Sequence, residues 1–163
     1  MRLGSPTRRG IVTGGTWCAD HNKFVTHWPS EEEVVEILTN EVRGGGSACN
    51  LAIDMKRLDP DIPVSTIGLI GDDEDGRILM AEADAAGIER SGLVIADTGS
   101  TSHTDAFTTA DTGRRTHLYL SGTAAKLSPD HFDFSTVNAR ILHLGLPGIH
   151  AAMDGAWGDD ANG

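Results

Sequence analysis

Hydrophobic and polar positions alternate with two different periods along this chain of 163 residues. Residues 11–16 (IVTGGT) form an apolar run that ends in glycine, and they predict a short buried strand. Residues 23–28 (KFVTHW) alternate between apolar and polar side chains, which is typical of a half-exposed strand, and Pro29 ends the pattern. Residues 31–43 leave two structures open, because their glutamate-rich start favours a helix whereas ILTNEV favours a strand.

The spacing of the apolar residues changes to three and four positions after Gly46, which predicts a helix with one apolar face. Ser47 is the predicted cap of this helix, and Asp59-Pro60 is its predicted end. The apolar residues at this spacing, with one neighbour, are Ala48, Leu51, Ala52, Met55 and Leu58.

The apolar runs that follow predict three more buried strands, at residues 63–71, 93–96 and 140–146. A helical spacing resumes at Ile78, and Gly87 is the expected end of that second helix. Strands that alternate with helices predict an α/β fold with a mainly parallel sheet.

A β-hairpin is predicted in the second half of the chain. Residues 104–110 and 114–120 are strand-like runs on either side of the turn sequence Asp-Thr-Gly. Together with the alternating residues after the first strand, this hairpin predicts a smaller accessory sheet.

Four consecutive carboxylates, residues 72–75 in GDDEDG, precede the second predicted helix. The helix dipole favours negative charge at this end, which is the simplest interpretation of the segment. A calcium-binding loop is the alternative, but the spacing of the carboxylates is not that of an EF-hand.

Composition narrows the class of protein. Hydrophobic residues make up 39% and charged residues 23%, as in a soluble globular protein, and the net charge of −11 argues against nucleic-acid and membrane partners. No apolar run is long enough to span a bilayer and no signal peptide is evident, so we expect a cytoplasmic protein. Cys18 and Cys49 are interpreted as buried free thiols, and we predict no metal site.

Four segments of the sequence resemble the ribokinase-like, phosphofructokinase-B-type (PfkB) family of carbohydrate kinases, and they follow that family's order. The segments are GGTWCADHN, GGSACNLA, IGLIGDDEDGRILMAEADAAGI and SGTAAKLSP. The first carries the aspartate of a glycine-led turn, here Asp20. The second contains Gly-Gly-x-x-x-Asn, here Gly45, Gly46 and Asn50, and the third matches Gly-x-x-Gly-x-Asp-x-x-Gly at residues 68–76.

The resemblance covers residues 11–148 and implies a three-layer, Rossmann-like α/β fold with a small β-sheet lid. The lid segments would be residues 21–43 and 101–121. The chain as a whole, residues 1–163, is identified by this resemblance as the N-terminal part of a sugar kinase domain whose C-terminal half is missing. A homodimer through the lid strands remains open.

The resemblance also implies a site for a small sugar substrate. Asp20 and Asn50 would bond sugar hydroxyls, and Gly45 and Gly46 would let the backbone approach the sugar. The alternatives are that Asp20 is a turn residue and that Asn50 bonds backbone at the helix start.

The lid would add contacts from the hairpin and exclude water. Thr104, Asp105 and Phe107 are the candidate lid residues. Arg114 and Arg115 are candidates for contact with an anionic group, but consecutive strand residues point to opposite faces, so at most one of them would reach it.

The sequence lacks the Gly-Ala-Gly-Asp motif that carries the catalytic aspartate of the family. ATP and Mg²⁺ are expected for the complete kinase, none is expected to bind strongly to this chain, and we expect the chain alone to be inactive. The alternatives are a non-catalytic module that binds a sugar or nucleoside, and an unstable truncated product. Ser47 replaces a lysine and Leu146 a glutamate of ribokinase, so ribose itself is not favoured as the substrate.

Overall fold

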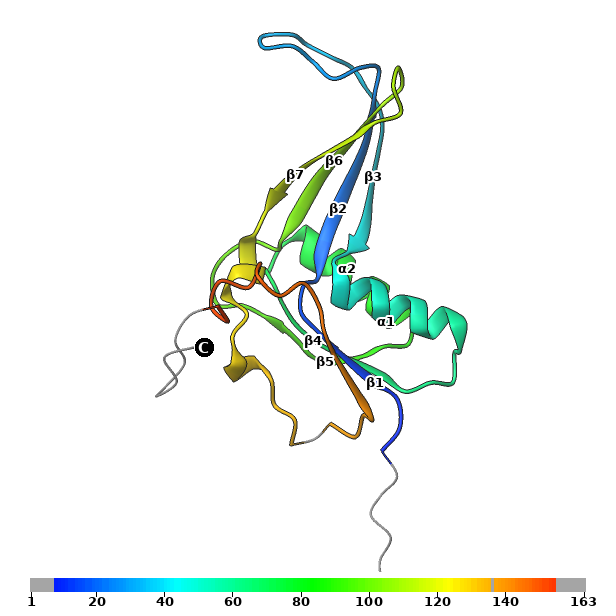
Figure 1. The fold of residues 1–163 in the computed structure, drawn as a ribbon, viewed down its shortest axis with the longest axis vertical. Coiled ribbons are helices and arrows are strands. Elements are labelled where there is room, and N and C mark those ends of the chain that lie inside the picture. Colours follow the sequence, from blue (N-terminus) through cyan, green and yellow to red (C-terminus); the bar gives the residue numbers. More distant parts are fainter. Residues whose placement is uncertain (1–7, 136, 155–163) are drawn as a thin grey trace, which may run out of the picture.

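Two four-stranded sheets organise the chain in the computed structural model, which describes residues 8–135 and 137–154 (Figure 1). The parallel sheet has the strand order β5-β4-β1-β8, and every neighbouring pair in it is parallel. Its strands are β1 (Ile11–Gly14), β4 (Val64–Ile70), β5 (Glu89–Ile95) and β8 (Ile141–Leu144). The chain runs from β1 to β4 and β5 on one side and returns to β8 on the other, so the strand order reverses between β1 and β8.

Two helices, α1 (Ser47–Leu58) and α2 (Glu74–Ala85), cover one face of the parallel sheet (Figure 1). Ala52 of α1 and Ala83 of α2 are fully buried in the core between the helices and this sheet. On the opposite face, Thr123 of the short helix η1 (Gly122–Lys126) donates a hydrogen bond to the carbonyl of Leu69 at 3.0 Å. A second short helix, η2 (Pro129–His131), follows η1.

The acidic segment before α2 acts as a helix start. Asp73 caps α2, since its Oδ1 accepts a hydrogen bond from the N–H of Gly76 at 2.9 Å. Glu74 and Asp75 lie in the first turn, where the helix dipole favours negative charge. Gly87, with a φ of 69°, follows the helix end. The helix-start interpretation of GDDEDG and the expected stop at Gly87 are both confirmed.

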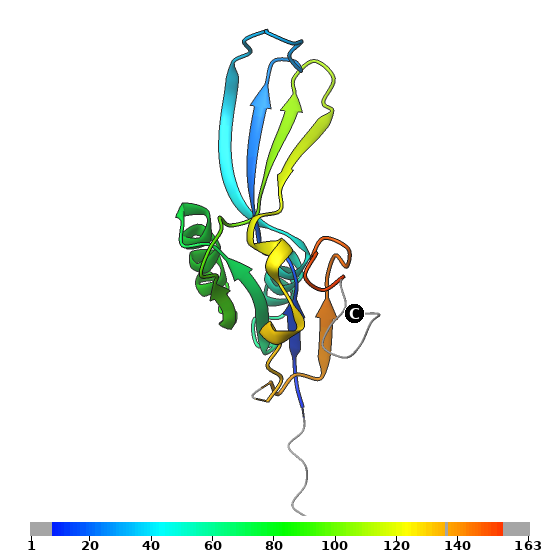
Figure 2. The same ribbon diagram turned by 90° about the vertical axis from the view of Figure 1, so that its left-hand side faces the viewer.

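The second sheet, here called the lid sheet, rises from the carboxyl edge of the parallel sheet (Figures 1 and 2). Its order is β3-β2-β6-β7, in which β2 and β6 are parallel and the two outer pairs are antiparallel. Its strands are β2 (Cys18–Val25), β3 (Ile37–Gly45), β6 (His103–Thr109) and β7 (Arg115–Leu120).

The two faces of the lid sheet carry different residues, because successive side chains of a strand point to opposite sides. The strand register places Cys18, Asp20, Asn22, Arg43, Thr104, Arg115 and Tyr119 on one side, the Asp20 face. It places His21, Lys23, His103, Asp105 and Phe107 on the other side, the His21 face.

A hydrogen-bonded group is buried between the parallel sheet and the helices. The indole Nε1 of Trp17, which is fully buried, donates to Oγ1 of Thr66 at 2.8 Å. Oγ1 of Thr13 donates to the same hydroxyl oxygen at 3.0 Å. The Thr66 hydroxyl in turn donates to the carbonyl oxygen of Thr13 at 3.1 Å. Every polar side-chain group of this cluster therefore has a partner, as burial requires.

The predicted α/β fold with a parallel sheet and a small second sheet is confirmed. Two local predictions are wrong. Ser47 does not cap α1, because Gly46 occupies the cap position, and the described residues show no side-chain cap hydrogen bond there. Leu58 lies at the helix end with 81% of its surface exposed. Residues 31–43, for which the sequence left helix and strand open, form the strand β3 from Ile37 onward, and their glutamate-rich start forms no helix.

We predict that Thr66→Val lowers the free energy of unfolding by about 1–3 kcal/mol, because it leaves the buried N–H of Trp17 without an acceptor. Thr66→Ser is the control, since it keeps the hydroxyl and loses only a methyl group, worth about 1 kcal/mol. Urea denaturation measures both. A Val variant as stable as the Ser variant would show that the hydrogen bonds contribute nothing.

Candidate functional site

Asp20 and Gly45 lie against each other at the base of the lid sheet. Asp20 is the third residue of β2, and Gly45 is the last residue of β3. A Cβ atom at position 45 would lie 2.2 Å from Oδ2 of Asp20, so glycine at this position leaves room for the carboxylate. Asp20 therefore lies inside a strand, and its interpretation as a turn residue is wrong.

Gly46 joins the lid sheet to α1 through an unusual backbone conformation. Its φ of 86° lies in the left-handed region, which glycine adopts without strain. A Cβ at Gly46 would lie 2.4 Å from the carbonyl oxygen of Thr16. The N–H of Ala48 donates to that same carbonyl at 3.3 Å. The end of β1 and the start of α1 are thus held together by a contact that only glycine permits.

Thr104 and Cys18 lie beside Asp20 on the Asp20 face. Thr104 is in register with Asp20, and its Oγ1 lies 3.4 Å from Sγ of Cys18. Burial raises the pKa of the Cys18 thiol to about 11, so the thiol is neutral at physiological pH. A carboxylate, a hydroxyl and a neutral thiol together offer both donors and acceptors to a polar ligand.

Asn50 lies on the exposed side of α1, where it lines a groove of 730 Å³ together with Arg43, Gly44 and Glu82. Oε2 of Glu82 accepts a hydrogen bond from the N–H of Gly44 at 3.0 Å and closes one wall of this groove. Within the described ranges, the Asn50 side chain forms no hydrogen bond with Asp20 or with backbone at the helix start. No hydrogen bond therefore joins Asn50 to the Asp20 carboxylate among the described residues.

Asp105 and Phe107 lie on the His21 face, away from Asp20. The ammonium group of Lys23 bonds the carboxylate of Asp105 and lies 5.5 Å from the centre of the Phe107 ring. The hydrogen bond from Lys23 holds the pKa of Asp105 below its usual value. Of the three predicted lid residues, Thr104 alone shares a face with Asp20.

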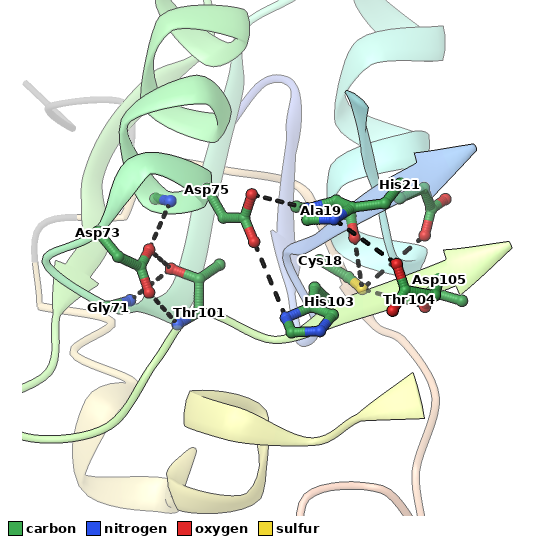
Figure 3. A network of polar contacts seen from close by, with 12 residues as sticks. Cys18, Ala19, His21, Gly71, Asp73, Asp75, Thr101, His103, Thr104 and Asp105 are labelled. Carbon is green, nitrogen blue, oxygen red and sulfur yellow. Dashed lines mark hydrogen bonds and ion pairs between the residues drawn. The ribbon is translucent and has the colours of Figure 1, made fainter. Parts of the chain in front are cut away.

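Asp73 links α2 to the segment that enters β6 (Figure 3). Its carboxylate accepts hydrogen bonds from the N–H and the Oγ1 of Thr101, at 2.8 and 2.5 Å, besides the cap bond from Gly76. Burial raises the pKa of Asp73, but the bonds from Thr101 and Gly76 outweigh it and lower the pKa overall. Thr101 Oγ1 in turn accepts from the N–H of Gly71 at 2.8 Å.

Three residues outside the predicted sugar site, His21, Asp75 and His103, form a second polar group next to Asp73 (Figure 3). Nε2 of His21 lies 2.8 Å from Oδ1 of Asp75, and Nδ1 of His103 lies 3.8 Å from Oδ2 of the same carboxylate. The two imidazole rings are stacked, with centres 5.2 Å apart. The only sequence feature that points to the two histidines is their position next to predicted site residues, since His21 directly follows Asp20 and His103 directly precedes Thr104.

The carboxyl ends of β1 and β8 face the start of α1. A Cβ at Gly145 would lie 1.9 Å from Oγ of Ser47, so the two segments are in close contact. Oγ of Ser47 and Nδ1 of His143 are buried and have no hydrogen-bond partner among the described residues. Leu146 adopts a φ of 52°. In open α/β sheets, ligands bind where the strand order reverses, and this edge is that position.

Across the described ranges, no group of three or more His, Cys, Asp or Glu side chains suits a metal ion. Likewise, none of the helices in that part of the chain is both long and apolar enough to cross a membrane. Both cysteines are free and buried, as interpreted from the sequence.

Comparison with known proteins gives a family and a fold. Residues 9–150 match the pfkB family of carbohydrate kinases. An ATP-dependent ribose-1-phosphate kinase of Halopiger xanaduensis is 28% identical over 135 residues, which are 82% of this chain and 45% of that protein. The chain therefore spans less than half the length of this relative.

Solved structures agree with this match. The ribokinase of Thermotoga maritima matches with a TM-score of 0.74 and 21% identity, and the match covers 82% of this chain and 44% of the ribokinase chain. The ribokinase of Arabidopsis thaliana, complexed with ribose and ATP, matches with a TM-score of 0.72 and 24% identity. The match covers 83% of this chain and 45% of the ribokinase chain. These likenesses show a ribokinase-like fold.

We predict that Gly46→Ala lowers the free energy of unfolding by about 1–3 kcal/mol, because it forces an L-residue into the left-handed region against the carbonyl of Thr16. Gly45→Ala is the matched control. The atoms nearest to its new methyl group belong to the carboxylate of Asp20, which can rotate away, so we expect a change below about 1 kcal/mol. Thermal unfolding followed by circular dichroism compares the two. Equal losses would contradict the contact described for Gly46.

We predict that Asp73→Ala destabilises the chain by about 1–3 kcal/mol at pH 7, through the lost cap and the unpaired N–H of Thr101. Because the folded-state pKa of Asp73 is lowered, its contribution is complete above the ordinary value of 3.8 and disappears as the pH falls through the folded pKa. The difference from the wild type should therefore narrow at acid pH in urea titrations. Asp72→Ala, which removes an exposed neighbour, should show little effect at any pH.

Proposed function

The chain belongs to the pfkB family of carbohydrate kinases, and on that premise we propose that it is the sugar-binding part of an ATP-dependent kinase that transfers a phosphoryl group to a sugar hydroxyl. The observation that carries this proposal is the placement of Asp20. Its carboxylate lies on one face of the lid sheet, at the carboxyl edge of the parallel sheet, in a space that Gly45 keeps free. A carboxylate in that place accepts hydrogen bonds from sugar hydroxyls.

Thr104, Gly45 and Gly46 complete the proposed sugar contacts. The Thr104 hydroxyl stands beside Asp20 and adds a second polar group that donates and accepts. The two glycines allow backbone to approach the ligand, as the family resemblance implies. Asn50, which lines a groove together with Arg43 and Gly44, is proposed as a further contact on the family resemblance.

Two arginines favour a substrate that carries a phosphate. Arg43 and Arg115 both lie on the Asp20 face, in a chain whose net charge is −11. Each guanidinium has more donors than its single observed partner uses, Glu41 for Arg43 and Asn22 for Arg115. The remaining donors fit a phosphate group. The relative from Halopiger xanaduensis acts, by its name, on ribose 1-phosphate, a substrate of this kind.

ATP and Mg²⁺ would supply and activate the phosphoryl group in the complete kinase. The resemblance places ATP in the later half of the family's chain, and it places the catalytic aspartate in a Gly-Ala-Gly-Asp segment that this sequence does not contain. No residue of this chain is therefore assigned to them. The chain's own part is to bind the sugar, orient its hydroxyl groups and cover it with the lid sheet.

We predict that ribose 1-phosphate binds the chain and that Asp20→Asn weakens this binding about tenfold to a hundredfold, as expected for a lost hydrogen bond to a charged group. Isothermal titration calorimetry measures the affinity, with ribose and a nucleoside as comparison ligands. Asp105→Asn is the matched control, since it changes a carboxylate on the opposite face of the same sheet. Binding that depends on Asp105 and not on Asp20 would place the sugar on the wrong face for this proposal.

A further inference from the structure

The lid sheet is fastened to α2 by a group of side chains on its His21 face. Asp75 belongs to the first turn of α2, whereas His21 and His103 belong to β2 and β6 of the lid sheet. One carboxylate oxygen lies 2.8 Å from His21 and the other 3.8 Å from His103. A single carboxylate thus contacts both central strands of the lid sheet from outside the sheet (Figure 3).

These contacts are partly shielded from solvent, and the two imidazole rings have a fixed relative orientation. The side chains of Asp75, His21 and His103 are 18%, 25% and 28% exposed. The imidazole planes lie within 10° of each other. An ionised carboxylate only accepts hydrogen bonds, so Nε2 of His21 is the donor to Asp75. The shielding distinguishes this group from the exposed ion pairs of the same helix, such as that of Glu74 with Arg77.

The group is not arranged to bind a metal ion. The lone pair of an imidazole nitrogen lies in the plane of its ring. The rings of His21 and His103 are stacked and nearly parallel. Their nitrogens therefore do not converge on one point at the distance of about 2 Å that a zinc–imidazole bond requires. The arrangement suits a mechanical role, in which hydrogen bonding and stacking fix two strands in place.

Each of the two histidines is adjacent to a residue of the proposed sugar face. His21 follows Asp20 in β2, and His103 precedes Thr104 in β6. Neighbouring residues of a strand share one backbone and point to opposite faces. Immobilising the two histidines on the His21 face therefore also immobilises Asp20 and Thr104 on the other face.

We propose that Asp75 is a positioning residue for the sugar site: it clasps His21 and His103 and so sets the orientation of Asp20 and Thr104. The role in sugar binding rests on the function proposed above, whereas the clasp itself does not. Lys23 and Asp105 flank the clasp on the same face of the lid sheet. Nδ1 of His21 lies 3.7 Å from Oδ1 of Asp105, so the His21 ring lies between two carboxylates.

Hydrogen–deuterium exchange of the full chain, followed by NMR, tests the clasp without any ligand. We expect Asp75→Ala to raise the exchange rates of the amides of β2 and β6 about tenfold, through loss of a charge-assisted hydrogen bond, and those of β1 and β4 less than about twofold. Asp75→Asn keeps an oxygen that accepts from His21 and should restore most of the protection. Glu74→Ala is the control, because it removes the neighbouring carboxylate of the same helix turn and leaves the lid contacts intact.

The proposal is overturned if the lid amides of Asp75→Ala exchange as in the wild type, or if β1 and β4 lose protection to the same extent. Should Asp75→Ala fail to fold, His21→Ala removes the 2.8 Å hydrogen bond to Asp75 from the lid side and must give the same pattern in β2 and β6.

The affinity for ribose 1-phosphate separates the two proposals. If the wild type binds, Asp75→Ala should weaken binding about tenfold, in line with the lost hydrogen bond, and Asp75→Asn should recover it. A loosened lid with unchanged affinity would contradict the positioning role. If the wild type binds no sugar or sugar phosphate, the proposed function fails, and the exchange rates at Asp20 and Thr104 alone decide whether Asp75 positions them.

Discussion

The close approach of Gly46 to the carbonyl oxygen of Thr16 constrains the base of the whole lid sheet. A side chain at position 46 would lie 2.4 Å from that oxygen, so the contact exists only because the residue is glycine. The same carbonyl receives the N–H of Ala48 and thereby sets the start of α1. Trp17, the next residue after Thr16, is buried at the end of β1 and leads directly into β2. The lid sheet, the helix and the parallel sheet therefore meet at one backbone contact.

Strand alternation then decides which lid residues act together. Along β2 and β6, successive side chains point alternately to the Asp20 face and to the His21 face. Asp20 and Thr104 lie on the face that we propose binds the sugar, whereas His21 and His103 on the other face lie next to Asp75. A thin sheet can in this way be anchored on one face and bind on the other, and the two functions require no additional residues.

The sequence was sufficient for the elements and insufficient for their contacts. Periodicity predicted α1, α2 and the strands of the parallel sheet, because one-sided burial leaves a local pattern. It misplaced Leu58, since the amphipathic pattern continues past the point where α1 still covers the sheet. The cap assigned to Ser47 failed for a similar reason: Gly46 already fills the cap position through its contact with Thr16, which is distant in sequence.

The site shows the same division. Two separate sequence segments predicted Asp20 and Gly45 as site residues, and the structure brings these two residues together. Asp105 and Phe107 were selected with Thr104 as one group, although alternation within a single strand separates Asp105 from Thr104. The partnership of His21 with His103 depends on the parallel register of β2 with β6, and a pairing between segments so far apart leaves no local trace in the sequence.

The acidic segment before α2 shows how one local preference supports a distant contact. Carboxylates are favoured at a helix N-terminus because the dipole and the free N–H groups there stabilise negative charge. Asp73 uses this position to cap the helix and also accepts two hydrogen bonds from Thr101 at the entry to β6. Asp75, one residue beyond Glu74 in the first turn, reaches His21 and His103. Two carboxylates of the same acidic segment thus serve the helix start and also contact the lid, Asp73 through Thr101 and Asp75 through the two histidines. The orientation proposed for the sugar face therefore depends on where α2 begins.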